Sequence, residues 1–184
     1  AVDPEKAVQN ALQLWKAEQY EDRFNLTSTV IDHWAPRLKE LLAKERILIL
    51  TEPEFVELVS YIHSTREHAR QCPKTLLGLP IDKESTVDIM VEKFAEWLWK
   101  QRSSKGKTVL EVLHYVIWGS GEVTQRLLDY KSFNNNGMPR LGISALGELV
   151  GWARPDEYPP RNERTSKTLN ALGYNVKVDL DKLA

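Results

Sequence analysis

The sequence has little cysteine and no long apolar run. Its 184 residues include one cysteine, Cys72, which excludes an intramolecular disulfide and any four-thiolate zinc or iron–sulfur site. No apolar stretch approaches the length that crosses a bilayer, so we expect no membrane partner. Residues 1–6 have neither a basic segment nor an apolar core of the secretory type, which predicts a cytoplasmic protein.

What the chain does contain is typical of a folded domain. Hydrophobic residues make up 42% of it, with six Trp, six Tyr and four Phe, and this excludes a disordered tail. Its length suits one domain or two small helical lobes. The chain opens with Ala1 instead of an initiator methionine, from which we expect a piece of a longer protein.

The net charge of −1 conceals two halves of opposite sign. Residues 1–99 contain 12 basic and 17 acidic side chains, and residues 100–184 contain 13 basic and 9 acidic ones. A basic half favours a polyanionic partner, because Lys and Arg pair with phosphates and release counterions. Ordinary variation in surface charge is the alternative explanation.

Apolar residues recur at helical spacing and no strand pattern is present, which predicts an all-α fold. Residues 47–50 fit either the end of a helix or a short extended segment. The expected helices cover 4–20, a stretch from about 27 that is interrupted at Pro36, 51–72 beginning at a Thr51–Glu54 capping box, 82–99, 108–118, 122–133, 147–153, and a last one ending at Leu172-Gly173.

A basic loop divides the predicted helices into two groups. Residues 100–107 contain four cations, no acid, two serines and a glycine, a composition typical of a solvated loop. We therefore predict an N-terminal helical lobe over 1–104 and a C-terminal lobe over 105–184.

One stretch of the C-terminal half carries a motif. Met138-Pro139-Arg140-Leu141-Gly142-Ile143-Ser144-Ala145-Leu146 is followed by Pro160-Arg161-Asn162, with Asn162 twenty residues after Gly142, and then by Leu172-Gly173. This arrangement resembles the helix-hairpin-helix superfamily of DNA glycosylases, in which a Leu-Pro-Gly-(Ile/Val)-Gly hairpin precedes a Pro-Val-Asp segment and a helix ending in Leu-Gly. The resemblance implies a two-lobed, glycosylase-like all-α domain with a C-terminal helix-hairpin-helix, and DNA as its partner.

Such a hairpin binds phosphate for a physical reason. A glycine lets the backbone approach a phosphate, and the following helix offers unpaired amides at its positive end. Cations nearby then hold the neighbouring phosphates, without reading bases. The candidate DNA-binding residues are Arg140, Gly142, Ile143, Ser144, Arg161, Asn162, Arg164 and Lys167, together with Lys105 and Lys107 of the basic loop.

Three departures from the glycosylase pattern argue against catalysis. Asn162 stands where those enzymes have their catalytic Asp, and an amide cannot act as that carboxylate. Arg140 replaces the first hairpin glycine, and the hairpin lacks the lysine that forms a Schiff base in lyase-type members. We therefore expect a non-catalytic module without a cofactor, in which Asn162 caps the helix that follows it.

A second resemblance extends over residues 109–119, 142–149 and 159–162. These segments are similar to helical pieces that precede the nucleotide-hydrolysing motor in McrB-like, modification-dependent restriction proteins. The resemblance implies a DNA-recognition part of a restriction or genome-defence system, joined to a motor domain or a partner subunit. No Gly-x-x-x-x-Gly-Lys-(Ser/Thr) sequence occurs, so we expect no nucleotide hydrolysis by this chain.

Two other functions stay open. One is an active base-excision glycosylase with a relocated carboxylate, and the other is a protein-interaction adaptor that works through its acidic N-terminal half. In the adaptor, Gly142 and Gly147 would merely permit close helix packing.

The remaining chemistry-bearing residues are assigned to structure. His63, His68, Cys72 and His114 lack a third ligand placed by spacing, so no metal site is predicted. Trp97 and Trp99 suit either base stacking or a helical core, and the core is favoured. Trp118 and Trp152 flank the hairpin region.

Overall fold

The computed structural model describes residues 3–17, 29–131, 137–159 and 163–176. Over these residues every regular element is a helix, which confirms the all-α prediction, and no helix of this part is long and apolar enough to cross a membrane. The α-helices are α1 (Pro4–Ala17), α3 (Ala35–Leu41), α4 (Glu52–Tyr61), α5 (His63–Gln71), α6 (Val87–Lys100), α7 (Val109–Trp118), α8 (Val123–Lys131), α9 (Ile143–Ala153) and α10 (Glu163–Ala171), with a π-helix η1 (Val30–Trp34) and a 3-10 helix η2 (Ile47–Ile49).

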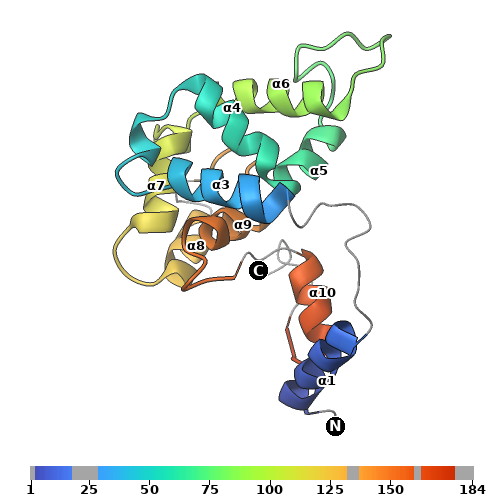
Figure 1. Cartoon of the computed structure of the whole chain (residues 1–184). Helices are drawn as coiled ribbons and strands as arrows, with labels where there is room; N and C mark the ends of the chain where they lie inside the picture. The colour runs from blue at the N-terminus through green and yellow to red at the C-terminus, as the bar shows by residue number, and fades with distance from the viewer. Residues whose placement is uncertain (1–2, 18–28, 132–136, 160–162, 177–184) are drawn as a thin grey trace.

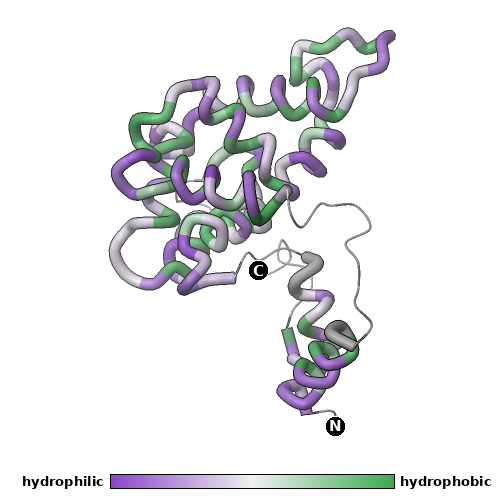
Figure 2. The backbone as a smooth tube through the Cα atoms, viewed as in Figure 1, coloured by the Kyte–Doolittle hydropathy of each residue, from purple (hydrophilic) through white to green (hydrophobic). Residues whose placement is uncertain are grey.

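Helices α3 to α9 form one packed body, while α1 and α10 are drawn below it in Figure 1. Apolar and polar residues alternate along the helices of the body (Figure 2), as expected where one face of each helix is buried. Helix α4 packs on α6, α5 packs on α6 and α9, and α3 and α7 pack on α9. The hairpin region is therefore built onto the same scaffold as the N-terminal helices.

The predicted lobe boundary lies in the turn between α6 and α7. The buried core continues across it, from Leu38 on α3 to Ala153 at the end of α9. The Trp118 indole Nε1 donates a hydrogen bond of 2.8 Å to the Leu42 carbonyl, which ties α7 to the end of α3. The division at residue 104 stays a prediction, but helices from both sides of it share one core.

Local sequence signals account for several helix starts. The Thr51–Glu54 capping box is confirmed, and Phe55, Leu58 and Val59 of α4 are buried. A second capping box opens α7, where the Glu111 carboxylate accepts from the Thr108 backbone N–H, and this bond lowers the pKa of Glu111. Six of the ten residues of α7 are buried, as its nearly continuous apolar sequence indicated.

Three predicted helices have different bounds in the structure. The helix expected over 51–72 is broken at Ile62, whose backbone is extended, so that α4 and α5 are separate. The helix expected from Asp82 begins at Val87, behind the N-cap Thr86. The helix expected from Gly147 begins one turn earlier, at Ile143.

Residues 47–50, before α4, form neither the helix end nor the extended segment that the sequence left open. Residues Ile47–Ile49 form a 3-10 turn with Ile47 buried. Pro36 lies where η1 passes into α3, so the expected interruption is a change from π to α geometry.

The break between α4 and α5 has a tertiary cause. Glu148 of α9 is 4% exposed, and its Oε1 accepts the His63 N–H at 2.8 Å. Its Oε2 accepts from the backbone N–H and the hydroxyl of Ser64, at 3.0 and 2.7 Å. A buried carboxylate thus satisfies the first amides of α5 and complements the positive end of that helix.

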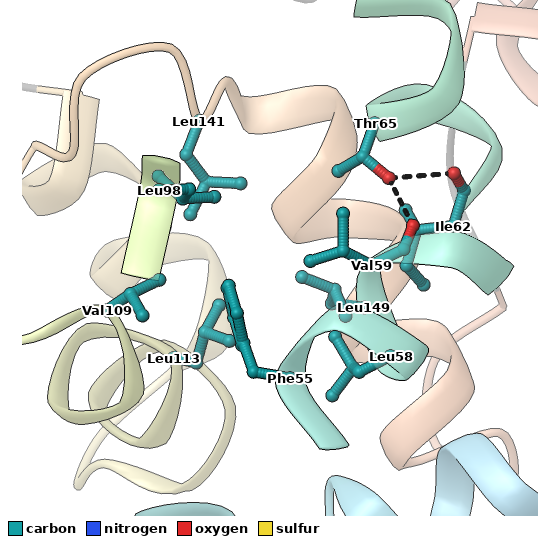
Figure 3. A pocket seen from close by; sticks show the side chains of 10 residues that line it. All are labelled: Phe55, Leu58, Val59, Ile62, Thr65, Leu98, Val109, Leu113, Leu141 and Leu149. Atoms are coloured by element: carbon teal, nitrogen blue, oxygen red, sulfur yellow. Dashed lines mark hydrogen bonds between the residues drawn. The ribbon is translucent and has the colours of Figure 1, made fainter. Parts of the chain in front are cut away.

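The hairpin contributes to the core through Leu141. Figure 3 shows Leu141 beside Leu98, in the lining of a cavity of about 10 Å³ that also includes Val109, Leu113 and Leu149. The Thr65 hydroxyl, the one polar side-chain group in this lining, is bonded to the carbonyls of Val59 and Ile62 at 2.8 Å each. The cavity is therefore a packing gap, too small and too apolar to hold a ligand or an ordered water.

Candidate nucleic-acid interface

A tight turn joins the residues that lead into α9. The Leu141 N–H donates to the Met138 carbonyl at 3.3 Å, and between them stand Pro139 and Arg140. Arg140 has a φ of +58°, the one positive φ at a non-glycine residue in the described ranges. Proline followed by a left-handed residue is the geometry of a type II turn, whose third position normally belongs to glycine. Arginine therefore occupies a strained backbone position.

Tyr130 of α8 holds this turn in place. Its hydroxyl accepts the Met138 N–H at 3.1 Å and donates to the Leu141 carbonyl. The ring is 5% exposed, and this burial raises the pKa of Tyr130 to about 12. Because Leu141 and Tyr130 are both buried, the turn is fixed from below while Arg140 stays exposed on its outer side.

The turn leads directly into the N-terminus of α9. Gly142 is the N-cap, is exposed, and provides no side chain to cap the helix. The first bond of the helix runs from the Leu146 N–H to the Gly142 carbonyl at 3.2 Å, so the amides of Ile143 and Ser144 precede the hydrogen-bonded ladder. Four of the predicted residues, Arg140, Gly142, Ile143 and Ser144, thus follow one another at the positive end of a helix.

Arg140 has one described polar neighbour. Its Nη1 lies 4.0 Å from the Sγ of Cys72, at the end of α5. Burial raises the pKa of the Cys72 thiol, and the Arg140 charge only partly opposes this, so the thiol stays protonated at neutral pH. No carboxylate in the described ranges pairs with Arg140. Its positive charge is therefore not neutralised by an ion pair there.

The basic loop is a second cationic element. The Ser103 hydroxyl accepts the N–H groups of Lys105 and Lys107, at 3.3 and 3.1 Å, which closes a compact turn. Lys105 is exposed, and the Lys107 Nζ lies 5.5 Å from the centre of the Tyr115 ring. The Tyr115 hydroxyl in turn donates to Asp129 of α8 at 3.3 Å. Side-chain contacts thus connect this loop to the helix that precedes the hairpin.

The other predicted DNA contacts lie on α10 and in the segment before it. Lys167 is exposed on α10, which Figure 1 draws apart from the helical body. Arg164 belongs to the first turn of α10, but its side chain is outside the described part of the structure. Arg161 and Asn162 lie outside the described residues, so the capping role of Asn162 stays a prediction.

The aromatic and metal candidates have structural neighbours. Trp97 and Trp99 pack against the core, with ring centres 6.1 Å from Phe94 and 5.5 Å from Phe55 respectively, as the favoured interpretation predicted. The His68 ring lies 5.5 Å from that of Phe94. In the described part of the chain no three His, Cys, Asp or Glu side chains gather as a metal site would require.

Sequence reasoning missed two residues that shape the site. Tyr130 anchors the hairpin turn, and no local pattern in its helix indicates this role. Glu148 did carry a signal, because it is the single charged residue in the apolar sequence of α9. A lone carboxylate in such a helix is expected to have a specific partner.

No protein-family model, curated protein or solved structure matches the chain. Its function is therefore inferred from its own residues and their geometry.

Proposed function

We propose that this chain is a non-catalytic DNA-binding module that grips the phosphate backbone through a helix-hairpin-helix. In this proposal the helix-hairpin-helix consists of α8, the hairpin turn Met138–Leu141 and α9, and it resembles that of DNA glycosylases. In this proposal, Gly142, Ile143 and Ser144 offer amides to one phosphate, and Arg140 pairs with the same or the next phosphate.

The observation that carries the proposal is the backbone of Arg140. A non-glycine residue at positive φ costs about 1–2 kcal/mol, and glycine would avoid this cost. The strained residue is a cation, is exposed, and stands two residues before Gly142, the N-cap of a helix that has no side-chain cap. Such strain is typical of functional positions, and an anion is the ligand that both the guanidinium and the amides favour.

The distribution of charge supports the same ligand. The basic half of the sequence contains the hairpin, the loop with Lys105 and Lys107, and the three predicted contacts Arg161, Arg164 and Lys167. The side-chain contacts from Lys107 through Tyr115 to Asp129 connect the loop to α8. In the proposal, loop and hairpin contact successive phosphates of one duplex.

Glu148 is the one buried carboxylate among the described residues, and it is a poor candidate for the relocated catalytic acid of a glycosylase. Both oxygens of Glu148 accept hydrogen bonds from the start of α5, and the side chain is 4% exposed. Together with Asn162 in the position of the glycosylase Asp, this favours binding without base excision. A place in a restriction or genome-defence assembly, with a fused motor or a partner subunit, rests on the second resemblance alone.

The experiment is a fluorescence-anisotropy titration of labelled duplex DNA between about 50 and 200 mM salt. Arg140→Gly is the decisive variant, because it removes the charge and suits the backbone. We expect it to weaken binding and to flatten the slope of log affinity against log salt by about one, while its thermal stability stays equal or rises. Arg140→Lys should keep most of the slope. The double substitution of Arg161 and Arg164 by Ala should flatten it by about one for each residue.

Arg70→Gln is the matched control, since Arg70 is an exposed cation on α5 of the acidic half. We expect it to leave the slope unchanged. Absence of DNA binding at low salt would contradict the proposed function, as would an Arg140→Gly protein that binds like the parent. Abasic sites generated in damaged or methylated duplex would contradict its non-catalytic part.

A further inference from the structure

A second pocket is lined by residues of the acidic half of the sequence and has no part in the proposed DNA site. It is an open cavity of about 350 Å³ between the end of η1, α4, the start of α5 and the first turns of α6. Trp34 and Tyr61 line it with aromatic surface, and three carboxylates, Glu57, Asp88 and Glu92, line it with negative charge. Arg66 is the one cation in its lining.

The aromatic side of the pocket is firmly positioned. The rings of Trp34 and Tyr61 are stacked, with centres 5.5 Å apart and planes inclined by 27°. The Tyr61 hydroxyl donates to Glu57 Oε1 at 3.1 Å, and Arg37 holds both oxygens of Glu57, with Nε at 2.9 Å and Nη2 at 2.8 Å. Trp34 is the last residue of a π-helical turn, a geometry frequent at functional sites.

The opposite side of the pocket retains negative charge. The Asp88 Oδ1 accepts a hydrogen bond of 2.8 Å from the Arg66 Nη2, but the Asp88 side chain is 81% exposed. Glu92 has only a distant cation, the Nζ of Lys93 at 3.9 Å. The surrounding half of the sequence is acidic as well, with 17 acidic and 12 basic residues over 1–99. An anion would therefore be repelled by Glu92, and an apolar group would leave Glu92 with no cation closer than Lys93.

We propose that this pocket binds the side chain of an arginine presented by a partner protein. A guanidinium is flat and weakly hydrated, so it stacks on the face of a Trp or Tyr ring while its N–H groups pair with carboxylates. The pocket offers both kinds of surface within one cavity, with Trp34 and Tyr61 on one side and Asp88 and Glu92 on the other. An ammonium group would use the charges but gain less from the rings.

The test uses the whole chain and three pentapeptides, Gly-Gly-Xaa-Gly-Gly with arginine, citrulline or lysine in the middle. Citrulline has nearly the shape of arginine without its charge. Binding is followed by ¹H–¹⁵N NMR at the Trp34 indole N–H, assigned with Trp34→Leu. We expect a saturable shift with the arginine peptide that salt weakens, a several-fold weaker response to lysine, and none to citrulline.

Glu92→Gln is the main variant, because Glu92 is an exposed residue with no described capping role. We expect Glu92→Gln to lower the affinity for the arginine peptide about threefold, and Trp34→Leu to lower it roughly three- to thirtyfold. Glu45→Gln is the matched control, since it removes the same charge from an exposed site outside the pocket. Thermal unfolding of each variant separates lost binding from lost folding.

Each contrary result has one meaning. Equal binding of citrulline and arginine would overturn the role of charge, and equal binding of lysine would overturn the choice of a guanidinium. An equal loss in Glu92→Gln and Glu45→Gln would show that net charge acts instead of this pocket, and no shift at Trp34 would refute the site altogether.

Discussion

The corner between α7 and α8 depends on a single buried cation, and this leads to a sharp prediction. Arg126 is 2% exposed, and its guanidinium donates to carbonyls at the end of α7 and just beyond it. Nε reaches the Val116 oxygen at 2.9 Å, Nη2 reaches that of Ile117 at 3.3 Å, and Nη1 reaches those of Ser120, at 3.3 Å, and Gly121. The charge is thus balanced by carbonyl dipoles at the negative end of α7.

Arg126→Met keeps a long side chain but removes every donor. The Ile117 carbonyl keeps a second donor, the Arg154 Nη1 at 3.0 Å, and Ser120 and Gly121 are exposed, so that water can replace the arginine there. The buried carbonyl of Val116 loses the Arg126 donor, which costs about 1–3 kcal/mol, and the packing of the long side chain is largely kept. The net loss of unfolding free energy is therefore expected to be about 1–3 kcal/mol. Gly119→Ala tests the same corner independently, because an added Cβ would stand 2.4 Å from the Tyr115 backbone oxygen and 2.9 Å from the Arg126 Cδ.

Urea unfolding monitored by circular dichroism measures this difference, with the slope of free energy against urea as an internal check. Arg126→Lys should lose roughly half as much as Arg126→Met, since an ammonium has three donors and cannot reach all four carbonyls. Arg70→Met, at an exposed site, should change stability by no more than about 0.5 kcal/mol. An Arg126→Met protein as stable as the parent, with an unchanged slope, would refute the claim that these carbonyls depend on Arg126.

Two further predictions concern the elements that hold the hairpin. The pKa of Tyr130 is raised to about 12 in the folded protein, whereas an unfolded Tyr titrates near pH 10. Its stabilising contribution is thus complete below pH 10 and is lost between about pH 10 and 12, by up to about 3 kcal/mol. Burial raises the pKa of Tyr61 and Tyr115 as well, so a titration at 295 nm is compared between the parent and Tyr130→Phe, which should have one late phenol fewer. As many late phenols in Tyr130→Phe as in the parent would contradict this assignment. Glu148→Gln should cost about 1–3 kcal/mol and speed hydrogen exchange at the first amides of α5; unchanged exchange there would contradict the capping role.

Sequence reasoning succeeded where the cause of a structure lies within a few residues of it. The Thr51–Glu54 capping box and the helix expected over 108–118 depend on local sequence, and both appear in the structure as predicted. The break at Ile62 is different, because the carboxylate that caps α5 belongs to Glu148, 85 residues further along the chain. The start of α6 was misplaced because the polar run from Asp82 offers several N-caps, and only the Thr86 hydroxyl binds the helix, through the Ile89 N–H at 3.3 Å.

In the candidate sites, too, the features with a local cause were predictable and those that depend on distant residues were not. The order of residues in the hairpin was readable from the motif, but the positive φ of Arg140 was not, because arginine is normally disfavoured there. The anchoring hydroxyl of Tyr130 comes from the preceding helix. The acidic pocket combines Trp34 with residues of three later helices, and no short window of sequence contains that set.

Helix α9 connects the two halves of the molecule. Its N-terminus is the second arm of the hairpin, and its Glu148 holds the start of α5, on which Arg66 lines the acidic pocket. Both candidate sites are thus built on one packed body, whose charge reverses from one half of the sequence to the other. In the two proposals, the acidic excess of residues 1–99 would disfavour phosphate there, so a duplex would bind at the hairpin and a basic partner at the acidic pocket would not compete with it. Under both proposals, the separation of charge along the chain, which sums to only −1, would let one small helical body hold two ligands of opposite sign.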